Sequence, residues 1–315
     1  MTESLAKGLT TRFFDELESG IEPVKDKFSE QLGRKKITRN SWSYVRHVAR
    51  DCFKDYALAM YEGGSERKPY ISLNLLLPLK SRCYNSWDEK CLTGAATIIN
   101  LVPFLIHSLP VPYNISEHAV ARLFLRTRIS LDNGLVDVKA INSELIYIPF
   151  WCCLWGLFLS DENLFGECQV LIPSPNGLFF AQTNLGKPHV EIRTFVGDHL
   201  LLDSQIQIKE SMIAMSKNFL NTPLSSVTIL ENLGIDETET VAAFICRKLL
   251  FDERITIILS AIMTQNTAKL DIGAVREKFI NFLRIRSGHL PENFFELFDK
   301  VGIRDAKKKL HIHQR

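Results

Sequence analysis

The segment CQVLIPSPNGLFFAQTNLGKPHVEIRTFV, residues 168–196, carries the clearest fold signal in the sequence. Three short runs rich in β-branched and aromatic residues alternate with two turn-forming segments, as in consecutive β-strands. The runs are 168–172, 178–182 and 190–196, and the turns are PSPNG at 173–177 and NLGKP at 184–188. Because proline, asparagine and glycine favour tight chain reversal, the segment predicts a compact antiparallel meander.

The residues before this meander mix helical and strand-like patterns. Residues 116–128 have the spacing of a short amphipathic helix, and 138–159 predict a second, mostly buried helix with a candidate break at Pro149. Two earlier stretches have the composition of buried strands, namely 70–77, which ends at Pro78, and 96–106, which Pro103 breaks.

Helical spacing dominates both ends of the chain. In residues 2–32 apolar side chains recur every four residues on one stripe, and a second helix is expected over about 42–61. After residue 203 the same spacing returns in 206–220, 236–250 and 273–286.

Together these patterns predict an α+β fold. We expect a small central antiparallel sheet with flanking helices, a helical N-terminal segment and a helical C-terminal region. The expected divisions are 1–66 for the helical N-terminal segment, 67–203 for the central α+β domain and 204–315 for the helical C-terminal region.

The composition is that of a folded protein. The chain has 315 residues, of which 46% are hydrophobic and 23% charged, and a formal net charge of +2. These values exclude a disordered chain, and they disfavour a histone-like protein held to nucleic acid by bulk charge. The seven cysteines include no C-x-x-C pair and fit a reducing cytoplasm. Motifs for phosphate loops, dinucleotides, zinc proteases and esterases are missing, so we expect neither a metal nor a cofactor.

Two uncharged stretches raise the question of membrane insertion. Residues 92–116 contain polar side chains and three prolines, and residues 145–160 (LIYIPFWCCLWGLFLS) are fewer than the about 20 that a spanning helix needs. We therefore expect buried core and no membrane span. Trp151, Trp155 and Phe158 in the second stretch leave a partner-binding face as an alternative.

The helix expected at 116–128 carries the candidate catalytic residues. In its sequence, SEHAVARLFLRTR, His118, Arg122 and Arg126 are spaced by four and would share one helix edge. Such a row of cations is unfavourable for a purely structural helix, because like charges at this spacing repel. A histidine can act as a general acid or base near neutral pH, and arginines can hold a phosphate. The row therefore suggests a site for a phosphodiester.

The pattern S-x-H-A-x-x-R-x-x-x-R, followed by a helix and a meander that ends in VEIRTF at 190–195, resembles the small ribonuclease toxins of the barnase–EndoU–colicin–RelE-like class. The resemblance covers about residues 110–203. It implies one or two helices packed on a small antiparallel sheet. It also implies metal-independent RNA cleavage, in which the 2′-hydroxyl attacks the neighbouring phosphate, as in a toxin or bacterial defence effector.

The same resemblance implies the role of each site residue. His118 would be the acid–base catalyst, and Arg122 or Arg126 would bind the phosphate. Arg193 or Thr194, on the last strand, would face the site.

Two alternatives stay open from the sequence. In the first, the helix is structural, His118 caps it or packs, and the arginines pair with acids such as Glu117, Asp132 or Glu191. In the second, the protein is a non-enzymatic interaction module for nucleic acid or a protein partner. The candidate nucleic-acid contacts are Arg34, Lys35, Lys36, Arg39, Arg46 and Arg50, beside the aromatic residues Trp42 and Tyr44. The candidate partners are thus RNA and a protein partner or inhibitor.

Overall fold

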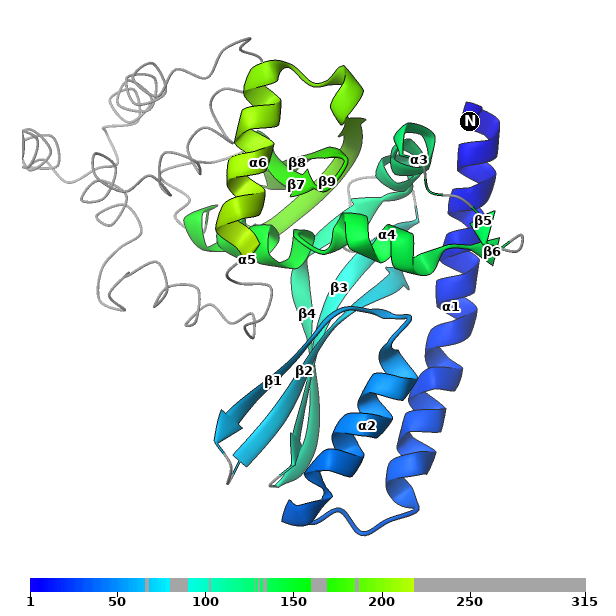
Figure 1. Cartoon of the computed structure of the whole chain (residues 1–315), viewed down its shortest axis with the longest axis vertical. Coiled ribbons are helices and arrows are strands. Elements are labelled where there is room, and N and C mark those ends of the chain that lie inside the picture. Colours follow the sequence, from blue (N-terminus) through cyan, green and yellow to red (C-terminus); the bar gives the residue numbers. More distant parts are fainter. Residues whose placement is uncertain are drawn as a thin grey trace, which may run out of the picture.

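The computed structural model describes residues 1–65, 68–79, 90–101, 103–127, 129, 131–132, 135–159, 169–184 and 187–217. Within these residues a seven-stranded mixed sheet is flanked by helices, as Figure 1 shows. The α+β class and the helical N-terminus predicted from the sequence are confirmed. The helices expected at 236–250 and 273–286 lie outside the described residues.

The main sheet consists of two antiparallel meanders joined by one parallel strand pair. The strand order is β1-β2-β3-β4-β9-β8-β7. The strands are β1 (Ala57–Ser65), β2 (Lys68–Leu79), β3 (Cys91–Leu101), β4 (Phe104–Ser116), β7 (Gln169–Ser174), β8 (Gly177–Asn184) and β9 (Lys187–Gly197). β4 and β9 are parallel and pair over only three residues each, Tyr113 to Ile115 with Val190 to Ile192. A separate two-stranded sheet contains β5 (Leu131–Asp132) and β6 (Leu135–Val136).

The meander predicted at 168–196 is therefore present as β7–β9, but the sheet is larger than expected and only partly antiparallel. Residues 57–61, predicted as the end of a helix, instead begin β1 because they pair with β2. Near the end of β1, Gly64 has a φ of 87°, a conformation that glycine adopts without steric cost. The expected division at residue 66 thus falls inside a hairpin, and residues 1–66 are not a purely helical segment. The single strand expected at 96–106 is the end of β3 and the start of β4, with the turn at Pro103.

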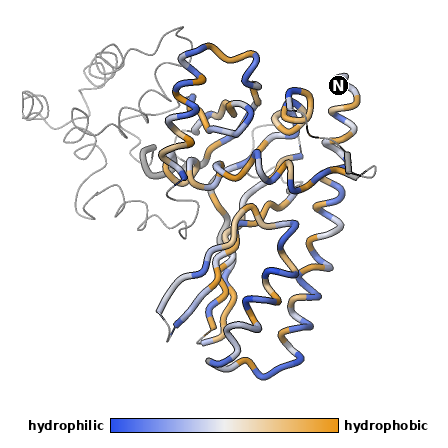
Figure 2. The backbone as a smooth tube through the Cα atoms, in the orientation of Figure 1, coloured by the Kyte–Doolittle hydropathy of each residue, from blue (hydrophilic) through white to orange (hydrophobic). Residues whose placement is uncertain are grey.

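The helices cover the sheet and lie close to their predicted positions. They are α1 (Glu3–Gly33), α2 (Trp42–Phe53), α3 (Glu117–Arg126), α4 (Val138–Leu145), α5 (Ile148–Leu159) and α6 (Asp203–Lys217), with short 3₁₀ turns η1 (Arg39–Ser41) and η2 (Asp198–Leu200). The helix expected at 138–159 is divided into α4 and α5, and Pro149 lies in the first turn of α5, where its missing N–H is tolerated. Along α1 and α2, apolar and polar residues alternate with helical periodicity (Figure 2), so each helix can bury one side.

The aromatic residues of α5 belong to the core. Trp151 and Trp155 are both 0% exposed and lie in the same apolar cluster as α1, α3 and β7–β9. The indole Nε1 of Trp155 donates a hydrogen bond to the carbonyl of Leu171 at 3.1 Å. The partner-binding face suggested for this stretch is therefore wrong for these two residues, because the sheet already covers them. None of the described helices combines the length and the apolar character needed to cross a membrane.

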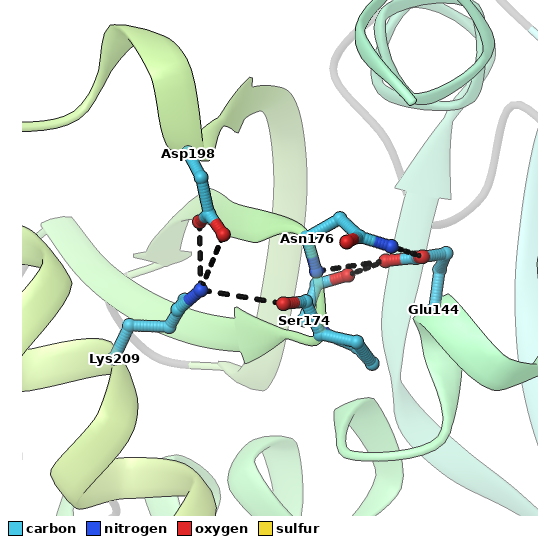
Figure 3. A network of polar contacts seen from close by, with 6 residues as sticks. Glu144, Ser174, Asn176, Asp198 and Lys209 are labelled. Carbon is cyan, nitrogen blue, oxygen red and sulfur yellow. Dashed lines mark hydrogen bonds and ion pairs between the residues drawn. The ribbon is translucent and has the colours of Figure 1, made fainter. Parts of the chain in front are cut away.

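A buried carboxylate holds the turn between β7 and β8. Glu144 of α4 is buried and accepts hydrogen bonds from the hydroxyl of Ser174 and the side-chain amide of Asn176 (Figure 3). The backbone N–H of Asn176 donates to the same carboxylate at 3.3 Å. Glu144 therefore connects α4 to the first turn of the predicted meander.

Lys209 of α6 holds the other side of this turn. Its ammonium group donates to both carboxylate oxygens of Asp198 at 2.7 Å and to the carbonyl of Pro175 at 3.3 Å (Figure 3). The turn between β7 and β8 is thus clamped between α4 and α6.

The Glu144→Ala substitution should lower the free energy of unfolding by about 1–3 kcal/mol, because it leaves the buried hydroxyl of Ser174 without its acceptor. Urea unfolding followed by circular dichroism measures the change. Lys139→Ala, an exposed position on the same helix, is the matched control and should change stability by less than about 0.5 kcal/mol. Equal effects of the two substitutions would contradict a clamping role for Glu144.

Candidate functional site

A pocket of about 430 Å³ lies where the first turns of α1 meet α3. The lining residues are Glu3, Ala6, Lys7 and Thr11 from α1, and Glu117, His118, Ala121, Arg122 and Leu125 from α3. Two of the predicted site residues, His118 and Arg122, are therefore brought together in one recess. Its volume is within the range of small-ligand sites.

Helix α3 is anchored at its N-terminus to β9. The hydroxyl of Ser116 caps the helix by accepting from the N–H of Ala119 at 3.1 Å, and it donates to the carbonyl of Arg193 at 3.1 Å. Serine is among the residue types most favoured at a helix N-cap. Because the cap is tied to the sheet, the orientation of α3 is fixed at the end that carries His118.

The apolar side of α3 fixes its rotation about its own axis. Val120, Leu123 and Phe124 are buried, and the ring of Phe124 packs edge-on against Phe13 of α1 with centroids 6.3 Å apart. The opposite edge of the helix therefore stays accessible. His118 is exposed, and the Arg122 side chain is 30% exposed.

Helix α1 supplies a second row of polar side chains opposite His118 and Arg122. Glu3, Lys7 and Thr11 are spaced by four residues and all line the pocket. The guanidinium of Arg122 lies 3.6 Å from the carboxylate of Glu3, which makes a long, partly exposed ion pair. Sequence reasoning missed these α1 residues. Their four-residue spacing indicates that they share one side of α1, but it does not indicate that this side faces α3.

Arg126 has a different role from the one predicted. Its guanidinium donates a hydrogen bond to the carbonyl of Phe195 on β9, and Arg126 is not among the residues that line the pocket. Burial lowers the pKa of Arg126, and the positive charge of Arg122 lowers it further. Arg126 thus fixes the C-terminal end of α3 to the sheet, while its charge adds to the positive potential beside Arg122.

Arg193 and Thr194 also lie outside the pocket lining. In the pairing of β8 with β9, Phe180 faces Thr194 while Ala181 faces Ile192, so Arg193 is the extra residue of a β-bulge. Its guanidinium lies 3.4 Å from the carboxylate of Glu191. The resemblance implied that Arg193 or Thr194 would face the site, whereas neither residue lines this pocket, and the bulge interrupts the alternation of side chains along β9.

The ion pairs considered from the sequence for the arginines of α3 differ from the contacts observed. Arg122 does approach an acid, but the acid is Glu3 on α1, none of those considered from the sequence. Arg126 is bonded to a backbone carbonyl. Since the Arg122–Glu3 contact is long and Arg122 is partly exposed, a competing anion can approach Arg122.

The basic residues near α2 are partly neutralised by acids. Arg46 and Arg50 both pair with Glu62 of β1, with N–O distances of 3.3 and 2.6 Å, and Arg34 pairs with Glu30. Lys36 is exposed, and the side chain of Arg39 lies outside the described residues. These contacts lower the positive charge available to a nucleic acid at this surface.

The aromatic residues beside this basic surface are used for packing. Trp42 and Tyr44 pack against the second apolar cluster, which joins α2 to β2 and β3. The hydroxyl of Tyr44 donates to the carbonyl of Gln31 at 2.6 Å, and the ammonium of Lys35 lies 4.3 Å from the centre of the Tyr44 ring. Stacking of Tyr44 on a base would require these contacts to be given up.

Among the described residues, no group of three or more His, Cys, Asp or Glu side chains is arranged to hold a metal ion. Comparison with known proteins gives no match to a family model, to a curated protein or to a solved structure. The functional inference therefore rests on the chemistry of the pocket between α1 and α3.

Proposed function

We propose that this protein is a metal-independent endoribonuclease whose site is the pocket between α1 and α3. One observation carries the proposal: His118 shares a recess with two cations from different helices, Arg122 and Lys7. An acid–base group next to a pair of cations can promote cleavage of a phosphodiester by an internal hydroxyl.

The proposed reaction uses these residues as follows. Arg122 and Lys7 bind the phosphate of one nucleotide and stabilise the charge that develops on its oxygens. His118 removes the proton from the 2′-hydroxyl, whose oxygen attacks phosphorus and displaces the 5′-oxygen. The products are a 2′,3′-cyclic phosphate and a 5′-hydroxyl. The leaving oxygen takes its proton from solvent water, and the imidazolium of His118 then releases its proton to the solvent, which restores the neutral base. Glu3 and Glu117 are the other ionisable groups of the lining.

The proposal includes the biological setting suggested by the sequence, a toxin or defence effector acting on RNA in the cytoplasm. Among the described cysteines, Cys52, Cys152 and Cys153 are thiols outside any disulfide bond, which suits a reducing compartment. The non-enzymatic alternative, a module that binds nucleic acid through the basic residues near α2, has weaker support, because Glu30 and Glu62 pair with three of those residues.

Binding to a non-cleavable RNA tests which surface contacts the nucleic acid. A single-stranded oligonucleotide with 2′-O-methyl groups has no attacking hydroxyl and should bind without reaction. We expect Arg122→Ala and Lys7→Ala each to weaken binding about tenfold and to reduce the dependence of log Kd on log salt concentration by about one unit, as for loss of a phosphate contact. Fluorescence anisotropy over a series of salt concentrations measures both quantities.

The matched control is Arg34→Ala, which removes an exposed arginine from the other end of α1. It should leave the affinity for the oligonucleotide unchanged. If Arg34→Ala weakens binding while Arg122→Ala does not, the basic surface near α2 is the contact and the proposed pocket is wrong.

A further inference from the structure

The first half of β4 is an exposed strand edge with apolar side chains. β9 pairs with β4 only at Tyr113 to Ile115, so among the described residues no strand lies beside the outer edge of Phe104–Ser108. Figure 1 shows this part of β4 running away from β7–β9. Phe104, Leu105 and Ile106 are 38%, 45% and 43% exposed. Natural sheets usually protect such an edge with charges, because its free N–H and C=O groups can pair with another strand.

The strand that forms this edge lacks the charged side chains that usually protect one. Residues 92–116 contain no Lys, Arg, Asp or Glu, so two copies of this strand can approach without charge repulsion. Pro103 and Pro110 lie on either side of the apolar segment, and proline has no N–H to donate to a neighbouring strand. The segment available for pairing is therefore confined to residues 104–109.

The buried core also reaches this edge. Ile106 lies opposite Ile99, and Phe104 lies opposite Leu101, in the pairing of β4 with β3. Ile99 and Leu101 are buried in the second apolar cluster, beneath α2, whereas their β4 neighbours are not. A strand added beside β4 would cover Ile106 and Phe104 and extend the same core.

We propose that two copies of this protein form a two-fold symmetric dimer in which the β4 strands pair antiparallel, centred on Ile106. In this register Ile106 faces its own copy, Phe104 faces Ser108, and Leu105 faces His107. Facing residues then fall on the same side of the joined sheet, as antiparallel pairing requires. A second copy suits this edge because an uncharged strand is self-complementary about a two-fold axis.

Sedimentation velocity of the full-length protein tests the proposal. The protein concentration should span a hundredfold range that ends at about 500 µM, because an interface formed by one short strand pair is small and therefore weak. The wild-type protein should shift from monomer to dimer as its concentration rises. Ile106→Lys places two like charges directly opposite each other and should weaken dimerisation at least about tenfold. Leu202→Lys, an exposed leucine just before α6, is the matched control and should behave like the wild type.

Mixing two charged variants tests the register itself. Ile106→Lys and Ile106→Glu should each be monomeric, and an equimolar mixture should regain the dimer because the two side chains then face each other with opposite charge. Circular dichroism of each variant shows that it is folded. The proposal is overturned if the wild type stays monomeric throughout, if Ile106→Lys dimerises like the wild type, or if the mixture stays monomeric. Because no RNA is present, these outcomes are separate from those of the proposed activity.

Discussion

The His118→Ala variant should cleave single-stranded RNA about 10²- to 10⁴-fold more slowly than the wild-type protein. This range is the usual contribution of a general acid or base to proton transfer in the transition state. The loss should appear in kcat, because the imidazole removes a proton and does not hold the phosphate, which is the role proposed for Arg122 and Lys7. Initial rates with a fluorogenic RNA substrate in the presence of excess EDTA give the ratio.

His118 is exposed at the N-terminal end of α3, so its replacement should leave the fold intact. His47→Ala is the matched control, because His47 is an exposed histidine on α2 that does not line the pocket. It should retain the wild-type rate. Equal rates for wild type, His118→Ala and His47→Ala would show that any RNA cleavage occurs elsewhere.

The Trp155→Ala variant should lose about 3–5 kcal/mol of unfolding free energy, the usual cost of truncating a buried aromatic side chain. Trp155 is 0% exposed, and the centroid of its ring lies 5.5 Å from that of Trp151. Its indole N–H donates a hydrogen bond to the carbonyl of Leu171. Truncation leaves a cavity and removes the hydrogen bond to the carbonyl of Leu171. The loss is a large fraction of the stability of an ordinary domain, so the variant should unfold at a much lower urea concentration.

Leu202→Ala is the comparison for this effect, because it removes an exposed leucine and should change stability by less than about 0.5 kcal/mol. The same experiment also tests the aromatic partner-binding face suggested by the sequence. If Trp155→Ala kept full stability, its side chain would have to be outside the core, and the packing of α5 on the sheet would be wrong.

The meander and the helix before it could be predicted because their signals are local. Proline, asparagine and glycine at 173–177 define the turn between two short apolar runs, and Ser116 is a favourable N-cap three residues before Ala119. Both features depend on neighbours within a few positions. They were therefore readable without knowledge of the rest of the chain.

The remaining strands depend on partners that are distant in sequence. Residues 57–61 follow helical spacing, yet they form β1 because β2 and β3 provide a sheet on which they can pair. The parallel pairing of β4 with β9 joins Tyr113 to Val190, and no local pattern indicates that contact. Tertiary contacts of this kind override propensity.

The candidate site shows the same division. The four-residue spacing of His118, Arg122 and Arg126 was visible in the sequence. That His118 and Arg122 line the pocket while Arg126 bonds to β9 depends on where α1 and β9 pack against α3. Lys7 becomes part of the site only because Phe13 and Phe124 hold α1 against α3. The sequence could predict candidate residues, whereas their grouping required the fold.

The products formed by the purified wild-type protein test the proposed activity most directly. Single-stranded RNA incubated with the protein in excess EDTA should yield fragments that end in a 2′,3′-cyclic phosphate, and the same strand made entirely of deoxynucleotides should stay intact because it has no attacking hydroxyl. Mass spectrometry of the fragments identifies the end group. Two results would contradict a ribonuclease site between α1 and α3. One is RNA that stays intact after prolonged incubation, and the other is cleavage of both the RNA and the DNA oligonucleotide to fragments with non-cyclic phosphate ends.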